Sequence, residues 1–290
     1  MIVDATPLAA PLLMLFILAM LVNHCQAVEE CSPQYYQSQT QAFVHKSESG
    51  LTMPYRLFVP SGYDPAKAYS LLLSLHGAGQ RGQDNLGQLC AYVAGWMAPQ
   101  VQDKHPCLIL MPQCPDDQQW VDTPWESGSY STAQVPISKA LTLAMEILEA
   151  VRKDYSIDPS RLYVIGASMG GYGTWDVIAR FPDLFAAAVP VCGAGDPQMA
   201  AKLVHLPIWA FHGDNDLTVP VSGSMDMVRA IQQAGGSRVR ITLYRGVGHA
   251  ALNMAWREDV LVEWVFSRQR PQPATSPAAS SASQPATRPR

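Results

Sequence analysis

The chain has 290 residues, of which 48% are hydrophobic, so it contains enough apolar material for one large domain or two small ones. Its formal net charge is −4, and its lysine and arginine residues form no cluster, so the sequence gives no electrostatic support for nucleic-acid binding. The cysteines lack C-x-x-C spacing and have no histidine neighbours at zinc-ligand spacing, so no metal site is predicted.

The N-terminus carries an apolar run from Leu8 to Val22, which ends near Cys25-Gln26-Ala27. This pattern is typical of a secretory signal peptide that is cleaved after Ala27, and the run is short for a membrane span. We therefore expect residues 1–27 to be removed and the mature protein to be secreted or periplasmic, with no stable membrane span. Because no lysine or arginine precedes the run, an uncleaved N-terminal membrane anchor is the alternative.

Cleavage after Ala27 would leave an odd number of cysteines, so at least one thiol would stay free. These are Cys31, Cys90, Cys107, Cys114 and Cys192. Cys107 and Cys114 flank a predicted strand and would pair if the chain turned back at Pro112. The sequence leaves the disulfide pairing open.

The first part of the mature chain predicts an antiparallel edge followed by buried parallel strands. Residues 28–39 have no clear periodicity and are expected to be irregular. Strands are predicted at 41–46, 55–60, 69–75 and 107–111, with a helix at 88–97. The strand at 69–75 is continuously apolar and ends in the glycine-rich turn His76-Gly77-Ala78-Gly79.

A long segment without periodicity, residues 112–135, follows these strands. Loops of this length in compact domains are usually functional or disordered. The segment contains Trp120 and Trp125, whose flat apolar faces suit sugar or aromatic rings. We predict that both side chains bind substrate, and the alternative is that both pin the loop to the body of the protein.

Strands and helices alternate in the second half of the chain. Strands are predicted at 162–165, 186–191, 206–211 and 239–244, and helices at 138–155, 170–180, 222–234 and 250–267, with Ser138 as an N-cap. This alternation predicts an α/β fold, a mostly parallel sheet covered on both faces, in one domain over residues 40–268. Residues 269–290 are rich in Pro, Ala and Ser and are expected to be disordered.

The turn after the strand at 162–165 has the sequence Gly166-Ala167-Ser168-Met169-Gly170, which fits G-x-S-x-G. A nucleophilic serine must stand clear of its own backbone, at a turn too tight for large neighbouring side chains. Gly166 and Gly170 provide that room. The helix that follows directs its free N–H groups and positive dipole end at developing negative charge. Ser168 is therefore the candidate nucleophile, and the alternative is an incidental serine in a glycine-rich turn.

A base and an acid that would serve Ser168 follow later in the chain, in the order that this kind of site requires. His249 lies in a glycine-rich loop after the last strand and is the candidate base. Asp214 and Asp216 both follow a strand at its carboxyl end, where the sites of open α/β sheets form. We favour Asp216 as the acid, with Asp214 capping the loop.

Backbone N–H groups would supply an oxyanion hole. In sites of this kind one donor is the residue after the nucleophile, here Met169, and the other comes from a loop after an earlier strand. The turn at residues 76–79 is that loop, and we place the second donor at Ala78. The alternative is that its glycines serve only to make an ordinary turn.

These motifs resemble those of the α/β-hydrolase superfamily of serine esterases and peptidases, over roughly residues 40–268. They are Leu75-His76-Gly77-Ala78-Gly79, Gly166-Ala167-Ser168-Met169-Gly170-Gly171, His212-Gly213-Asp214-Asn215-Asp216 with Val219-Pro220, and Gly248-His249. Within the superfamily the chain looks like the secreted single-domain group that includes polyhydroxybutyrate-depolymerase-like enzymes, feruloyl-esterase-like enzymes and phospholipase/carboxylesterases. The family pattern places the acid three residues before Val219, which is Asp216.

The resemblance implies a secreted carboxylic-ester hydrolase that acts through an acyl-enzyme and needs no cofactor or metal. Superfamily lids are usually inserted between the strand ending near Val191 and the one starting near Leu206, and this connection is too short for a helical cap. An open site without a cap domain favours bulky or polysaccharide-linked esters. A serine peptidase of the same fold and an inactive hydrolase-fold binding protein are the alternatives, and the sequence leaves the oligomeric state open.

Overall fold

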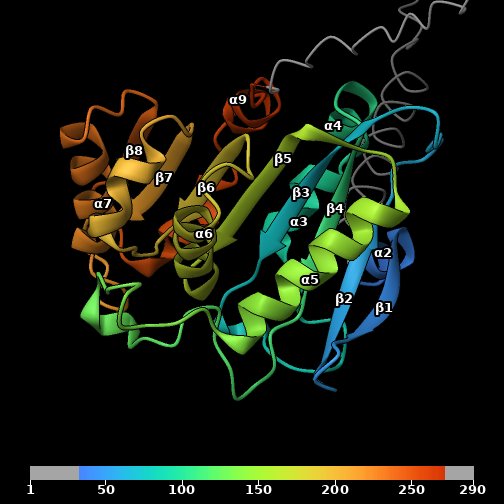
Figure 1. Ribbon diagram of the computed structural model, residues 1–290. Helices are drawn as coiled ribbons and strands as arrows, with labels where there is room; N and C mark the ends of the chain where they lie inside the picture. Colours follow the sequence, from blue (N-terminus) through green and yellow to red (C-terminus); the bar gives the residue numbers. More distant parts are fainter. Residues whose placement is uncertain (1–32, 272–290) are drawn as a thin grey trace, which may run out of the picture.

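A computed structural model describes residues 33–271 of the chain (Figure 1). The predicted signal peptide, Cys31 and residues 272–290 of the predicted disordered tail lie outside the described residues. Residues 269 and 270 bind the body of the protein, because the Gln269 amide and the Arg270 backbone N–H both donate to Ser160. The folded body therefore extends a few residues beyond the predicted boundary at residue 268.

The centre of the molecule is one eight-stranded sheet with the order β1-β2-β4-β3-β5-β6-β7-β8. β1 pairs antiparallel with β2, and β2 pairs antiparallel with β4, whereas all other neighbours are parallel. This confirms the predicted antiparallel edge on a mostly parallel sheet. The strands are β1 (Thr40–Lys46), β2 (Thr52–Phe58), β3 (Tyr69–Leu75), β4 (Cys107–Pro112), β5 (Ile157–Ala167), β6 (Ala187–Val191), β7 (Ile208–Gly213) and β8 (Val239–Tyr244).

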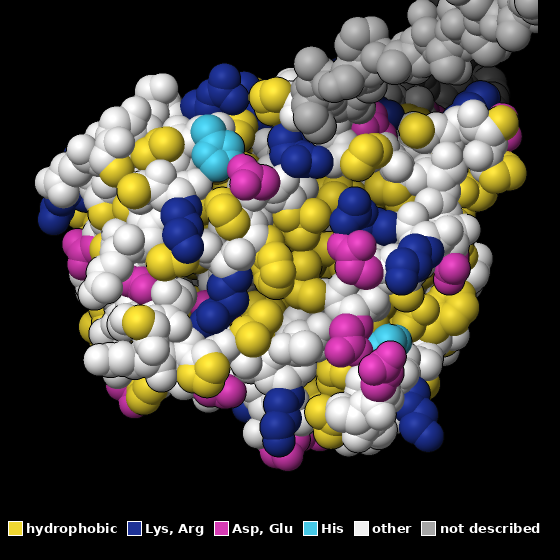
Figure 2. Space-filling model, viewed as in Figure 1, with side chains coloured by type: hydrophobic (Ala, Val, Ile, Leu, Met, Phe, Trp, Pro, Cys, Tyr) yellow, Lys and Arg dark blue, Asp and Glu magenta, His cyan; other side chains and the backbone are white. Residues whose placement is uncertain are grey.

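Helices cover both faces of the sheet, as continuously apolar parallel strands require. The helices on one face are α5 (Lys139–Asp154), α6 (Met169–Arg180) and α7 (Ser222–Gln233), and those that pack on the other are α2 (Pro33–Gln39), α3 (Ala91–Met97), α8 (Leu252–Ala255) and α9 (Leu261–Phe266). α4 (Pro99–Lys104) leads into β4. Figure 2 shows the face of α5 and α6, where acidic and basic side chains are interspersed around apolar ones. All helices between residues 33 and 271 are too short or too polar to cross a membrane.

Ser138 is the N-cap of α5, as predicted, since its hydroxyl accepts the Leu141 backbone N–H at 3.0 Å. Two other expectations for helices are wrong. Residues 33–39, expected to be irregular, form α2, whose Tyr36 is buried against the sheet. The predicted final helix over 250–267 is divided into a 3₁₀ turn and two short helices, and the break contains Asp259, a poor helix former.

The four cysteines in the described part of the chain are all free. The pairing considered for Cys107 and Cys114 is therefore wrong. β4 runs extended between them, and an extended strand advances about 3.3 Å per residue, which separates their Cα atoms far beyond the roughly 7 Å limit for a disulfide.

The topology gathers the predicted site residues at one edge of the sheet. β3, β5, β6, β7 and β8 are consecutive parallel neighbours, so their carboxyl ends lie together. The connection between β6 and β7 contains only the short helix η3 (Pro197–Leu203), which packs against α7 and α6. The chain thus places no cap domain in this connection, in agreement with the sequence prediction.

Candidate active site

Ser168 stands at the sharp turn between β5 and α6. Its φ of 56° and ψ of −119° lie in a region that non-glycine residues rarely adopt. The turn is tight, because a Cβ atom on Gly166 would overlap the Gly170 carbonyl and a Cβ atom on Gly170 would overlap the Leu75 carbonyl. The Ser168 N–H donates to the Val191 carbonyl at 2.8 Å, and the Ser168 residue is partly exposed. The two glycines therefore perform the role that the sequence predicted.

His249 begins the 3₁₀ turn η4 (His249–Ala251), which follows β8. Its Nδ1 lies 2.7 Å from Asp216 Oδ2, and its Nε2 lies 2.9 Å from Ser168 Oγ. Because a carboxylate only accepts hydrogen bonds, Nδ1 carries the proton and Nε2 is left to accept the serine hydroxyl proton. The structure thus brings Ser168, His249 and Asp216 into one continuous chain of hydrogen bonds.

Asp216 lies in the turn after β7, and its side chain is buried although its neighbours Asn215 and Leu217 are exposed. Its Oδ1 accepts the backbone N–H groups of Thr218 at 2.9 Å and Val219 at 3.0 Å, and its Oδ2 accepts from His249 and faces the imidazole of His212 at 3.5 Å. Burial alone would raise the pKa of Asp216, but these donors outweigh burial and hold the pKa far below its usual range. The carboxylate is therefore charged at neutral pH, with one oxygen against His249 Nδ1.

Asp214, the other candidate acid, is exposed, and its Oδ1 accepts the Gly246 N–H at 2.7 Å. It links the loops that follow β7 and β8, whereas the carboxylate that bonds His249 is that of Asp216. This arrangement favours Asp216, as the sequence analysis did.

The two predicted oxyanion donors each begin a helical segment. Ala78 is the first residue of the 3₁₀ helix η1 (Ala78–Gln80), and Met169 is the first residue of α6. Backbone N–H groups at these positions have no acceptor within their own helix. The two segments are in contact, since a Cβ atom on Gly77 would lie 3.7 Å from Ser168 Cβ. Both N–H groups are therefore located beside the serine.

Side chains that the sequence analysis did not identify hold the loop of Ala78 in place. The Gly77 N–H donates to the Tyr92 hydroxyl at 2.9 Å, and this hydroxyl donates to Gln80 Oε1 at 3.0 Å. His76 is buried, and burial lowers its pKa to about 4. The neutral ring donates from Nδ1 to the Gly77 carbonyl at 2.7 Å and accepts the Cys114 N–H at Nε2 at 2.9 Å. No sequence pattern around Tyr92 indicates this function.

Trp120 is fully buried, so the prediction that it binds substrate is wrong. Its indole N–H donates to the His76 carbonyl at 2.9 Å, and its ring packs edge-on to the His76 imidazole, 5.2 Å between centroids. It pins the loop over residues 112–135 to the body of the protein, which was the alternative interpretation. The apolar core attracts the large ring, and the sequence of an aperiodic loop does not reveal which of its aromatic residues enter the core.

Trp125 is only partly buried and starts the 3₁₀ helix η2 (Trp125–Ser127). Its carbonyl accepts the Tyr172 hydroxyl at 2.7 Å, and the Arg81 guanidinium lies 5.8 Å from its ring centroid. Tyr172 belongs to the first turn of α6, and Arg81 follows the loop of Ala78. Trp125 is thereby tied to both segments that surround Ser168, and its indole N–H lacks a hydrogen-bond partner in the described part of the chain.

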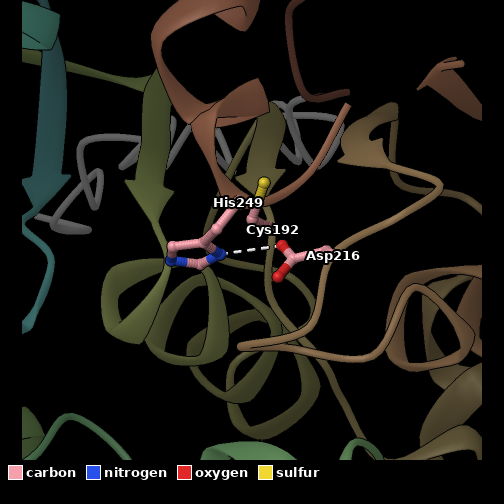
Figure 3. Close-up of side chains that lie close together, drawn as sticks. All are labelled: Cys192, Asp216 and His249. Carbon is pink, nitrogen blue, oxygen red and sulfur yellow. Dashed lines mark hydrogen bonds and ion pairs between the residues drawn. The ribbon is translucent and has the colours of Figure 1, made fainter. Parts of the chain in front are cut away.

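Cys192 lies next to the acid and the base (Figure 3). The ligand atoms of Cys192, Asp216 and His249 are all within 4.8 Å of one another, and residues of these types can bind a metal. Burial, followed by the charge of Asp216, raises the pKa of the Cys192 thiol to about 12, so the thiol is protonated. Asp216 Oδ2 and His249 Nδ1 are hydrogen-bonded to each other, so Nδ1 carries a proton and offers no lone pair to a metal in this arrangement.

This architecture, with a strained serine turn after a central parallel strand and a histidine after the last one, is that of the α/β-hydrolase fold, which the chain shares with solved esterase structures. Residues 127–264, a stretch that contains Ser168, Asp216 and His249, match the Dienelactone hydrolase family.

Several relatives are named as ester hydrolases, and solved structures that share the fold at lower identity also include peptidases. A crystal structure of a thermostable esterase is 36% identical, with a TM-score of 0.73, and the match covers 80% of this chain and 64% of that one. Poly(3-hydroxyalkanoate) depolymerase C of Paucimonas lemoignei is 33% identical over 142 residues, which are 47% of this chain and 30% of the depolymerase. The probable feruloyl esterase C of Aspergillus terreus is 26% identical over 188 residues, 63% of this chain and 62% of that esterase. The chain thus spans less than two thirds of these relatives.

Proposed function

We propose that the protein is a serine hydrolase that cleaves carboxylic esters, with Ser168 as nucleophile, His249 as general base and Asp216 as the orienting acid. The observation that carries this proposal is the uninterrupted hydrogen-bonded chain from Ser168 Oγ through the imidazole to Asp216 Oδ2. Its position at the carboxyl edge of the sheet and the names of the relatives support the same conclusion.

In the first chemical step His249 Nε2 accepts the Ser168 proton while Oγ attacks the ester carbonyl carbon. The imidazolium that forms is stabilised by Asp216, which remains ionised. His249 then donates the proton to the departing alkoxide oxygen, and the alcohol leaves. The acyl group stays on Oγ, and a water molecule activated by His249 releases it as the carboxylic acid.

The tetrahedral oxyanion would accept hydrogen bonds from the Met169 and Ala78 N–H groups. Each such donor contributes roughly 3–4 kcal/mol to catalysis in measured cases. The positive end of α6 adds to this stabilisation, because Met169 is its first residue. The loop of Ala78 is held by Tyr92 and His76, so the donors are in position before the substrate binds.

The substrates that fit this proposal are bulky, soluble or polymer-linked esters. The short connection between β6 and β7 leaves Ser168 and His249 partly exposed, and the side chain of Trp125 is available as one wall. We also propose that residues 1–27 are a signal peptide and that residues 40–268 are the catalytic domain. Secretion would bring the enzyme into contact with such polymers. The named substrates of the relatives, a polyhydroxyalkanoate and a feruloyl ester, belong to this class.

A panel of p-nitrophenyl esters of increasing acyl length, with a feruloyl ester and an acetylated oligosaccharide, tests the proposal. An aminoacyl p-nitroanilide tests the peptidase alternative in the same assay. We expect hydrolysis of esters by the wild type, none by Ser168→Ala, and at least a hundredfold lower rate on the anilide. Equal rates of the wild type and Ser168→Ala would refute the assignment, and preference for the anilide would favour the peptidase.

A further inference from the structure

His212 lies beside Asp216 and faces the same carboxylate oxygen as His249. It is the second-last residue of β7, and its side chain is fully buried. Its Nε2 lies 3.0 Å from the Val219 carbonyl oxygen and 3.5 Å from Asp216 Oδ2. Its Nδ1 lies 2.8 Å from Ser224 Oγ, at the start of α7. The mechanism described above does not use this imidazole.

The neighbours of His212 determine where its proton must be. Both neighbours of Nε2, a carbonyl and a carboxylate, only accept hydrogen bonds. A lone pair on Nε2 would face two oxygens, so Nε2 carries a proton in the folded protein. Ser224 Oγ also lies 2.9 Å from the Gly193 carbonyl oxygen. The Ser224 hydroxyl therefore donates its proton either to this carbonyl or to His212 Nδ1. In both arrangements the Nε2–H points between Val219 and Asp216.

We propose that His212 is a positioning residue, whose Nε2–H is shared between the Val219 carbonyl and the Asp216 carboxylate and thereby holds the acid toward His249. This inference rests on the proposed function and assigns a further residue to that site. The shared proton restrains both ends of the turn 216–219, whose Thr218 and Val219 N–H groups hold the other carboxylate oxygen. Ser224 fixes the ring from its far edge and connects it to Gly193, a residue of the segment that follows β6.

The shared proton also limits how much negative charge His249 experiences. Titratable groups face Asp216 from several elements: His212 from β7, His249 from η4 and the Cys192 thiol from the segment after β6, while the Tyr172 phenol on α6 senses its charge. Of these, His212 and His249 donate to the same carboxylate oxygen. Without the His212 donor, Asp216 would attract the His249 imidazolium more strongly.

The test compares His212→Phe, which keeps an aromatic ring but removes the donor, with His212→Gln, whose amide N–H reaches about as far along the side chain as Nε2. For His212→Phe we expect a loss of kcat of about 10²–10³-fold with KM changed less than about threefold. The acid limb of its kcat/KM profile should move toward higher pH by roughly half a unit to one unit. His212→Gln should recover most of kcat and return the acid limb to the wild-type position.

Ser224→Ala provides a second, milder variant, because it frees the far edge of the ring and leaves the Nε2 side intact. We expect a loss of kcat of about 3–10-fold and a smaller shift of the acid limb in the same direction. If His212→Phe does not fold, the acid limb of Ser224→Ala tests the proposal instead. A shift toward higher pH would support a positioning function of His212, and an unchanged acid limb would overturn it. Circular dichroism and thermal melts identify a variant that has lost its fold.

The proposed function and this inference fail in different ways. A wild-type protein that does not hydrolyse esters, and whose Ser168 is not labelled by a fluorophosphonate, would overturn both. An active wild type whose His212→Phe variant is folded and has unchanged kcat and an unchanged acid limb would overturn only the inference. A folded His212→Gln variant with the same defect as His212→Phe would also overturn it, because the defect would then not depend on the donor.

Discussion

Two segments at the carboxyl edge of the sheet, the turn 214–219 and the loop 112–135, form opposite kinds of wall around Ser168. In the turn, the carboxylate of Asp216 is buried and faces donors on both oxygens. In the loop, Trp120 is buried in the core, while Trp125 is partly exposed and lacks a partner for its N–H in the described part of the chain. The acid of the turn thus has a complete set of polar contacts, whereas the loop is held by the buried Trp120 and keeps Trp125 partly exposed.

This difference distinguishes a side chain that must be held in one geometry from a side chain whose position can vary. An orienting acid works only in one geometry, and its many donors impose that geometry. A side chain that lines a substrate site needs only an exposed face, and the buried Trp120 supplies the anchoring that leaves Trp125 free for that role. Substitutions in the turn should therefore affect kcat, and substitutions in the loop should affect stability or KM.

The largest expected effect is in the turn. Asp216→Asn should lower kcat by about 10⁴-fold, because the amide no longer holds His249 in the productive tautomer. Asp214→Asn, two residues away, should lower kcat by less than about tenfold, since the amide oxygen can still accept the Gly246 N–H and only the charge is lost. Steady-state kinetics on one p-nitrophenyl ester measure both. A larger loss in the Asp214 variant would show that Asp214, and not Asp216, is the acid.

The next effect concerns the anchor of the loop. Trp120→Ala should lower the free energy of unfolding by about 3–5 kcal/mol, the usual cost of removing a fully buried large aromatic side chain. The matched variant Trp125→Ala should lower it by much less, because that ring is partly exposed. Urea unfolding of both variants measures the difference. Equal destabilisation would mean that both rings anchor the loop.

The dependence of stability on pH tests the turn in a different way. The pKa of Asp216 is lower in the folded than in the unfolded chain, where it is about 3.9, so its contribution to stability is present above that pH and is lost as the pH falls further. The gap in melting temperature between the wild type and Asp216→Asn should therefore shrink between about pH 5 and pH 2. A constant gap over this range would show that the carboxylate is not stabilised as its contacts imply.

The smallest expected effect is at Trp125, the partly exposed tryptophan of the loop. Trp125→Ala should raise KM for a feruloyl or glycosyl ester by about 3–10-fold, the worth of one aromatic contact, and should leave KM for p-nitrophenyl acetate almost unchanged. The two substrates are compared on the same enzyme preparation. An equal rise for both esters would indicate that Trp125 supports the fold of the site instead of contacting the larger substrates.

The sequence predicted the turn better than the loop for a physical reason. Ser168, Asp216 and His249 each follow a parallel strand, and parallel strands bring their carboxyl ends together, so the chain order alone places them in one site. The loop has no periodicity that distinguishes Trp120 from Trp125, and burial there depends on what the rest of the chain leaves uncovered. The contacts of Tyr92 and His212 depend in the same way on how the turns after β3 and β7 fold back onto them, which the sequence pattern does not show.

Local propensity also limited the prediction of helices. The predicted helix over 250–267 has apolar residues on both sides of the charged run Arg257-Glu258-Asp259, and the structure breaks it at this run, where Glu258 accepts a hydrogen bond from the Tyr244 hydroxyl at 2.7 Å. Residues 33–39 form α2, and Tyr36 packs against the sheet. This tertiary contact is not apparent from the sequence of so short a segment.

If an ester substrate acylates Ser168, as proposed, mass spectrometry of the protein during turnover will detect the acyl-enzyme. The wild type, acid-quenched during hydrolysis of a slow p-nitrophenyl ester, should gain the mass of one acyl group, on the peptide that contains Ser168. Ser168→Ala, treated in the same way, should gain none. An acyl group on another residue of the wild type, or the same mass gain in Ser168→Ala, would contradict the account.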